Sequence, residues 1–187
     1  MDVSSQEAQE SLRLIEDTQA RWRKAIGASH ASGLLLLWGG IWIIGYTSLY
    51  FSHQIGGYVF TALDVLGIGG TVLIARRWPV RGPEARAAFL NLTGLWLFLA
   101  LYAVVWILLL RPVTGNQFGA LLCTVCMFGY VVIGLWFKSP FMIGLGLAVT
   151  ALIVIGFYLL PDYFYLWAAL TGGGAVLGTG LYIRRWR

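Results

Sequence analysis

The stretch IGGYVFTALDVLGIGGTVLIARR, residues 55–77, decides the fold of this chain. Residues 55–75 contain a single charged side chain, Asp64. A helix of this length spans the roughly 30 Å hydrocarbon core of a bilayer, because each residue adds about 1.5 Å. Arg76 and Arg77 follow directly. A long apolar segment that ends in arginines is typical of a transmembrane helix whose basic end stays in the cytoplasm.

Other apolar runs of similar length occur on both sides of this stretch. Short turns separate most of them, so we expect consecutive runs to form three antiparallel hairpins. The sequence therefore predicts an all-α integral membrane protein, in which residues 29–187 form a bundle of six transmembrane helices. The predicted spans are residues 33–51, 55–75, 89–110, 117–137, 141–160 and 163–183.

Positive charge is distributed unevenly across these spans. The chain has 13 Lys and Arg residues, and with six spans all of them except Arg111 fall on one side. Basic residues in short loops remain cytoplasmic, so we expect both termini in the cytoplasm. The compact chain with short loops indicates a plasma membrane, in particular a bacterial inner membrane. The basic span ends are expected to anchor the bundle on anionic lipid of the inner leaflet through Arg76, Arg77, Arg184 and Arg185.

Composition excludes several classes of protein. The chain is 59% hydrophobic and 11% charged, whereas soluble domains carry about 25% charged residues. The net charge of +5 does not indicate nucleic-acid binding, because the basic residues lie beside membrane ends rather than along one recognition element. No nucleic-acid partner is expected.

Residues 1–28 precede the first span and predict an amphipathic helix. Leu12, Ile15 and Trp22 recur at helical spacing and form one apolar stripe. Such a helix lies in the headgroup region with Trp22 as its anchor, or packs on the cytoplasmic ends of the bundle. The alternative interpretation is a helix that binds a partner protein.

Asp64 is the only acidic residue deep within a predicted span, close to the bilayer midplane. An ionised Asp at the centre of a lipid-facing helix costs at least about 2.5 kcal/mol, so Asp64 is expected to face the bundle. One interpretation is a site for a proton or cation on a transport path. The other is a structural Asp that hydrogen-bonds Thr, Tyr or Trp groups and sets helix register. Neighbouring candidates for the site are Thr61, Thr71, Tyr102 and Tyr130.

Glycines are concentrated in the second and sixth spans. Small residues at i, i+4 spacing allow helices to approach closely, so tight packing is the simpler interpretation. The alternative is a locally opened helix over residues 171–174, since irregular backbone is tolerated in a membrane only where it lines a cavity. The residues concerned are Gly67, Gly70, Gly172, Gly173, Gly174 and Gly178.

The sequence predicts no cofactor and no metal site. Cys123 and Cys126 have the spacing of a redox motif but lie within an apolar helix, where small packing residues are the better interpretation. His30 and His53 bracket the first span, about 34 Å apart along a helix, so they cannot bind one metal together.

An enzyme is not expected, because the spans contain no Ser/His pair or carboxylate pair. The sequence leaves two hypotheses for the function. The leading hypothesis is a small transporter or channel-like bundle, a homo-oligomer that carries a small molecule or ion. The endings LIARRW at 73–78 and LYIRRW at 181–186 resemble an internal repeat, which is common in transporters. The alternative is a regulatory or lipid-binding membrane protein that acts through its N-terminal helix.

Overall fold

The computed structural model describes residues 32–76, 83–111 and 114–185, and every element in these ranges is a helix. Six helices are long and apolar enough to cross a membrane, which confirms the prediction of a multi-pass membrane protein. The first helix covers Ser32–Phe51, and the sixth span covers Pro161–Arg185. Between them lie α2 (His53–Arg76), α3 (Pro83–Leu110), α4 (Gly115–Trp136) and α5 (Pro140–Leu159).

The sixth span is made of several helical types. It begins with a 3₁₀ turn, Pro161–Tyr163, and continues as α6, Phe164–Ala168. A π-helical segment, Ala169–Gly173, separates α6 from α7, which covers Gly174–Arg185. A π turn closes its hydrogen bonds from residue i to i+5 and so accommodates one extra residue. Such turns occur frequently at functional sites.

The tight connections follow from capping chemistry. At the start of α4, Thr114 and Gln117 form a reciprocal capping box, which satisfies two backbone N–H groups at the helix terminus. Ser139 caps α5, and Pro140 is the first residue of that helix. Proline costs no hydrogen bond at this position, because a backbone N–H there would have no partner within the helix. Lys138 completes the reversal with φ at 52°, in the left-handed region.

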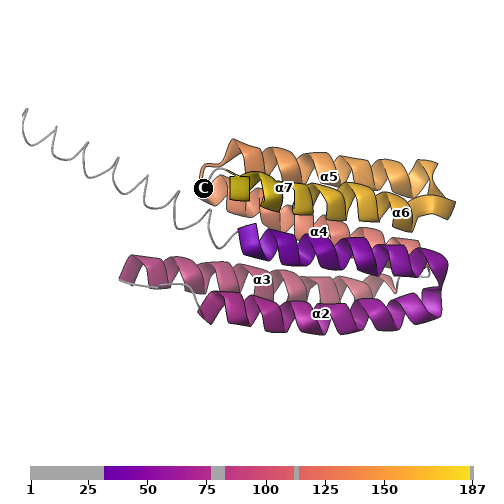
Figure 1. Cartoon of the computed structure of the whole chain (residues 1–187), viewed down its shortest axis with the longest axis horizontal. Coiled ribbons are helices and arrows are strands. Elements are labelled where there is room, and N and C mark those ends of the chain that lie inside the picture. Colours follow the sequence, from indigo (N-terminus) through magenta and orange to yellow (C-terminus); the bar gives the residue numbers. More distant parts are fainter. Residues whose placement is uncertain (1–31, 77–82, 112–113, 186–187) are drawn as a thin grey trace, which may run out of the picture.

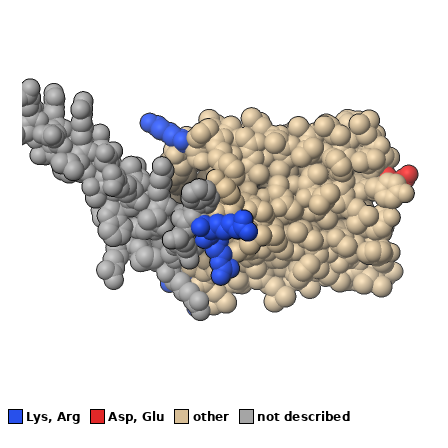
Figure 2. Space-filling model, turned by 45° about the horizontal axis from the view of Figure 1, so that its top comes forward, with Lys and Arg blue, Asp and Glu red and all other residues tan. Residues whose placement is uncertain are grey.

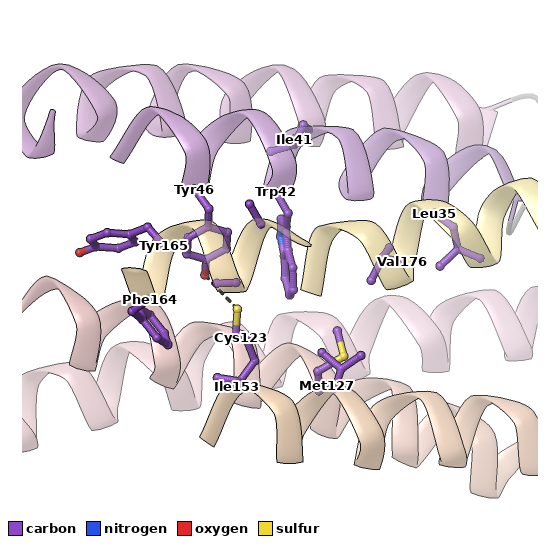
Figure 3. Packing of buried hydrophobic residues seen from close by; sticks show 13 residues of the cluster. Leu35, Ile41, Trp42, Tyr46, Cys123, Met127, Ile153, Phe164, Tyr165 and Val176 are labelled. Carbon is purple, nitrogen blue, oxygen red and sulfur yellow. Dashed lines mark hydrogen bonds between the residues drawn. The ribbon is translucent and has the colours of Figure 1, made fainter. Parts of the chain in front are cut away.

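The core lies between the first helix, α4, α5 and the sixth span, which Figure 1 shows side by side along the long axis. Figure 3 shows large side chains from these elements meeting in one cluster. The side chains that are almost fully buried in it are Tyr46, Cys123, Met127, Val149, Ile153, Phe164 and Val176.

Helices α2 and α3 lie at the edge of this core. In the most apolar stretch of each of these two helices, 6% of the residues are buried within the bundle. The corresponding share in the sixth span is 39%. Their exposed side chains are nevertheless apolar, as in Leu66, Leu97 and Leu108. Surfaces of this kind are compatible with a hydrocarbon environment.

The ends of the bundle differ in charge. Figure 2 shows Lys and Arg side chains at one end of the described bundle and acidic atoms at the other. We call the first the basic end; it carries Arg76, Arg184 and Arg185 at the ends of α2 and α7, and all three are exposed. The amphipathic helix predicted for residues 1–28, together with the anchors Trp22 and Arg77, falls outside the described residues.

Candidate functional site

Asp64 lies in the middle of α2, half-buried, beside the line along which α2 packs on the first helix. Gly67, one turn towards the basic end, is buried in that line: a Cβ added there would lie 2.5 Å from Ile41 Cδ1 and 3.2 Å from the Trp38 ring. Phe60, one turn the other way, has its ring centroid 5.0 Å from that of Tyr46. Along α2, Asp64 therefore lies between two points at which α2 contacts the first helix.

Asp64 is on the inward face of α2. Phe60, Gly67 and Thr71, which share this face by helical spacing, are not exposed, whereas Thr61, Val65 and Ile68 are exposed. Phe60 and Gly67 both pack on the first helix, so this face of α2 is turned towards that helix. This agrees with the expected cost of exposing the group to lipid.

The polar side chains where the first helix meets α2 and α4 are hydrogen-bonded. Trp38 Nε1 donates a hydrogen bond to Thr71 Oγ1 at 3.0 Å. Tyr46 Oη lies 3.2 Å from the carbonyl oxygen of Gly119 and 3.0 Å from Cys123 Sγ, and Figure 3 shows the Tyr46–Cys123 contact. A hydroxyl has one proton, so when Tyr46 donates to Gly119 the Cys123 thiol is the donor to Tyr46.

No side chain in the described part of the chain donates a hydrogen bond to the Asp64 carboxylate. The Thr, Tyr and Trp groups that a purely structural role requires, Thr71, Tyr46 and Trp38, are bonded elsewhere. The described residues also contain no buried polar side-chain atom without a partner, so the Asp64 oxygens are not completely buried in apolar packing.

The structure brings together only some of the predicted site residues. Thr71 lies in the contact between α2 and the first helix. Tyr130 lies on α4 one turn beyond Cys126, with its ring centroid 6.1 Å from that of Trp96 on α3. Tyr130 therefore packs where α4 meets α3, rather than in the contact between α2 and the first helix.

Two predicted site residues face away from Asp64. The Tyr102 side chain is 63% exposed on α3. Thr61 is exposed on α2, and its hydroxyl donates to the Gly57 carbonyl oxygen of its own helix at 2.9 Å. The structure does not place either residue beside the carboxyl group.

The glycines also divide into two groups. A Cβ added at Gly70 would lie 2.8 Å from Leu37 Cδ2, and one at Gly172 would lie 3.2 Å from the Trp42 ring. At Gly173 the added Cβ would lie 2.9 Å from the backbone nitrogen of Ile43. By contrast, a Cβ at Gly178 would meet nothing within 4 Å, and one at Gly174 only a carbonyl oxygen at 4.0 Å. Close helix approach within the described bundle therefore uses Gly172 and Gly173 rather than the Gly174/Gly178 pair.

Several residues at this site have no distinctive spacing in the sequence. The pairing of Tyr46 with Cys123 and of Phe60 with Tyr46 depends on how helices pack, and no residue pattern within one helix encodes it. A weak signal is the glycine three or four residues from a polar group, as with Gly67 beside Asp64, because it marks where a neighbouring side chain crosses the helix.

The chemistry available at Asp64 is that of one carboxylate. Among the described residues, no group of three or more His, Cys, Asp or Glu side chains is placed to hold a metal ion. A single negative charge near hydroxyl and thiol groups is suited to a proton or a monovalent cation. No family model, curated protein or solved structure matches this chain.

Proposed function

We propose that this protein is a small membrane transporter or channel in which Asp64 takes up and releases a proton or a monovalent cation. Acidic residues within membrane helices recur in proton relays and ion pathways, because keeping them in the membrane is costly. The observation that carries the proposal is the half-buried position of Asp64 on the inward face of α2, where no described side chain donates a hydrogen bond to its carboxyl group.

The proposal includes an orientation and an arrangement of the spans. The basic end faces the cytoplasm of a bacterial cell, where Arg76, Arg184 and Arg185 contact anionic lipid. The six spans are organised as three antiparallel hairpins, preceded by an amphipathic helix on the cytoplasmic surface. No catalytic residue is assigned to the protein.

The proposed assembly is a homo-oligomer in which α3 faces a second copy. Side chains tilt towards the N-terminus of their helix, and Tyr102 lies in the second half of α3, so its phenol is directed back towards the membrane centre. Its side chain is 63% exposed there. A hydroxyl at hydrocarbon depth favours a position against protein over one against lipid.

The test is ion flux through purified full-length protein in liposomes. A proton gradient or membrane potential is imposed, and internal pH is followed with a trapped dye, with Na⁺ or K⁺ exchanged between experiments. Wild-type protein is expected to carry flux, and Asp64→Asn is expected to lower it by at least tenfold. Asp162→Asn makes the same chemical change at an exposed turn and is expected to match the wild type.

Two results contradict this function. If wild-type liposomes leak no faster than protein-free ones for any of the three cations, the regulatory or lipid-binding role through residues 1–28 becomes the better hypothesis. If Asp64→Asn carries the wild-type flux, ions pass but Asp64 is not their site.

A further inference from the structure

Two contacts between α2 and the first helix lie on opposite sides of Asp64. Thr71, which bonds Trp38, is seven residues beyond Asp64, or about 10 Å towards the basic end. Phe60, which packs on Tyr46, is four residues before Asp64, or about 6 Å towards the other end. The carboxyl group thus lies between two cross-helix contacts.

The contact on the basic side depends on Trp38 and Gly67. The missing side chain of Gly67 leaves room for Ile41 and, slightly farther away, for the Trp38 ring, whose indole nitrogen bonds Thr71 one turn beyond Gly67. The indole therefore lies at a level of α2 between Asp64 and the basic end. Its single hydrogen bond is weak enough to break and re-form during a conformational change.

The contact on the other side depends on two aromatic rings. The Phe60 ring lies directly over Gly45, which has no side chain to exclude it, and meets the Tyr46 ring at an interplanar angle of 68°. Tyr46 is held in turn by Gly119 and Cys123 of α4. The ring of Phe60 is therefore the movable member of this pair.

Helix α2 is suited to alternate between two positions. Only 6% of the residues in the most apolar stretch of α2 are buried, so little packing opposes a small tilt of α2 against the first helix. Of its residues, only Gly56 and Gly67 are buried. A tilt about the level of Asp64 opens one contact while it compresses the other.

We propose that Trp38–Thr71 and Phe60–Tyr46 are the inner and outer closures of the path to Asp64, and that they open alternately. This rests on the proposed transport function, for which it supplies the order of access: the ion reaches Asp64 from one side while the closure on the other side remains shut. In the conformation described here both contacts are formed.

The experiment measures from which side position 64 is reached. Full-length protein carrying Asp64→Cys, Cys123→Ser and Cys126→Ser is prepared in right-side-out and inside-out membrane vesicles. A membrane-impermeant thiol reagent is added, and the labelling rate at position 64 is followed by mass spectrometry. Thr71→Val removes the acceptor for Trp38 while preserving shape, and Phe60→Ala removes the outer ring.

Thr71→Val is expected to raise labelling from the cytoplasmic face about fivefold and to leave labelling from the outer face unchanged. Phe60→Ala is expected to raise labelling from the outer face and to leave labelling from the cytoplasmic face unchanged. Gly67→Ala, whose methyl group would crowd Ile41 and the Trp38 ring, should behave as Thr71→Val does, whereas Gly69→Ala, where an added Cβ meets nothing within 4 Å, should have no effect. Should Phe60→Ala not fold, Phe60→Leu shortens the contact while retaining an apolar side chain.

Equal changes from both faces, or no change in any variant, would overturn the two closures. Ion flux is measured in parallel on the same substitutions made in protein that retains Asp64. Flux that depends on Asp64 without sided labelling supports transport and eliminates the closures. Sided labelling without flux in any condition supports the closures and eliminates transport.

Discussion

The hydroxyl of Tyr46 and the thiol of Cys123 lie 3.0 Å apart, and they join the first helix to α4 in the most tightly packed part of the bundle. The two residues are 77 positions apart in the chain. Neither side chain is solvent-exposed: Tyr46 is 1% exposed and Cys123 is fully buried. Because the pair is buried and specific, its loss is expected to lower the stability of the bundle.

Tyr46→Phe and Cys123→Ala are each expected to destabilise the protein by about 0.6–1 kcal/mol, the range for one hydrogen bond within a membrane bundle. Cys123→Ser keeps a donor and acceptor at the same place and should cost less. Reversible unfolding in mixed detergent micelles measures the differences. A double variant, Tyr46→Phe with Cys123→Ala, should cost no more than slightly above either single change; full additivity would show that the two groups act independently.

Gly173→Ala is expected to destabilise the bundle by about 1–3 kcal/mol. The added methyl group would lie 2.9 Å from the backbone nitrogen of Ile43, and backbone atoms of a packed helix do not move aside without cost. Gly178→Ala is the matched control, because an added Cβ there meets nothing within 4 Å. It should be neutral or stabilising by up to about 1 kcal/mol through helix propensity. Thermal melting in detergent separates the two, and equal losses would contradict the packing described for the sixth span.

Tyr102→Cys is expected to form a disulfide-linked dimer in membranes treated with a mild oxidant, if α3 faces a second copy as proposed. The protein would carry Cys123→Ser and Cys126→Ser so that position 102 provides the only thiol. Val104→Cys serves as the control, since it is 52% exposed but lies two residues on, on a different face of α3. Dimers from both positions, or from neither, would be evidence against this interface.

The orientation can be tested with thiols at two exposed turns. On the same cysteine-free background, His53→Cys should react with an impermeant reagent in intact cells, and Lys138→Cys should react only after the membrane is opened. Both residues are exposed, so burial does not account for a difference in labelling. The opposite pattern would place the basic end outside and reverse the proposed orientation.

The six spans could be predicted from the sequence because each is encoded locally. A run of about 20 apolar residues specifies a membrane helix irrespective of its neighbours. The predicted span at 55–75 and the helix at His53–Arg76 differ by only a few residues at each end. Asp64 could be singled out for the same reason, as the one acid within such a run.

The surroundings of Asp64 could not be predicted, because they depend on how each helix is rotated about its own axis. Tyr102 and Tyr130 were equivalent candidates by depth, yet one is 63% exposed and the other packs on Trp96. Tyr46 resembles an interface residue by composition alone, and only the packing of α4 on the first helix shows that it is buried. Periodicity within a nearly uniformly apolar helix carries too little contrast to identify its inner face.

The π-helical segment Ala169–Gly173 has a consequence for the length of the chain. One series of buried residues in the sixth span has a spacing of four positions: Phe164, Ala168, Gly172, Val176 and Gly180. Over 16 positions a regular α-helix of 3.6 residues per turn would carry such a series nearly halfway round its axis. The extra residue in the π turn removes most of that drift. The span is thus one residue longer than its contacts require. Deletion of the exposed Leu170 should be tolerated, because the span can then continue as a straight α-helix. Deletion of one residue within α5 would instead rotate every later residue of that helix by about 100° relative to its contacts.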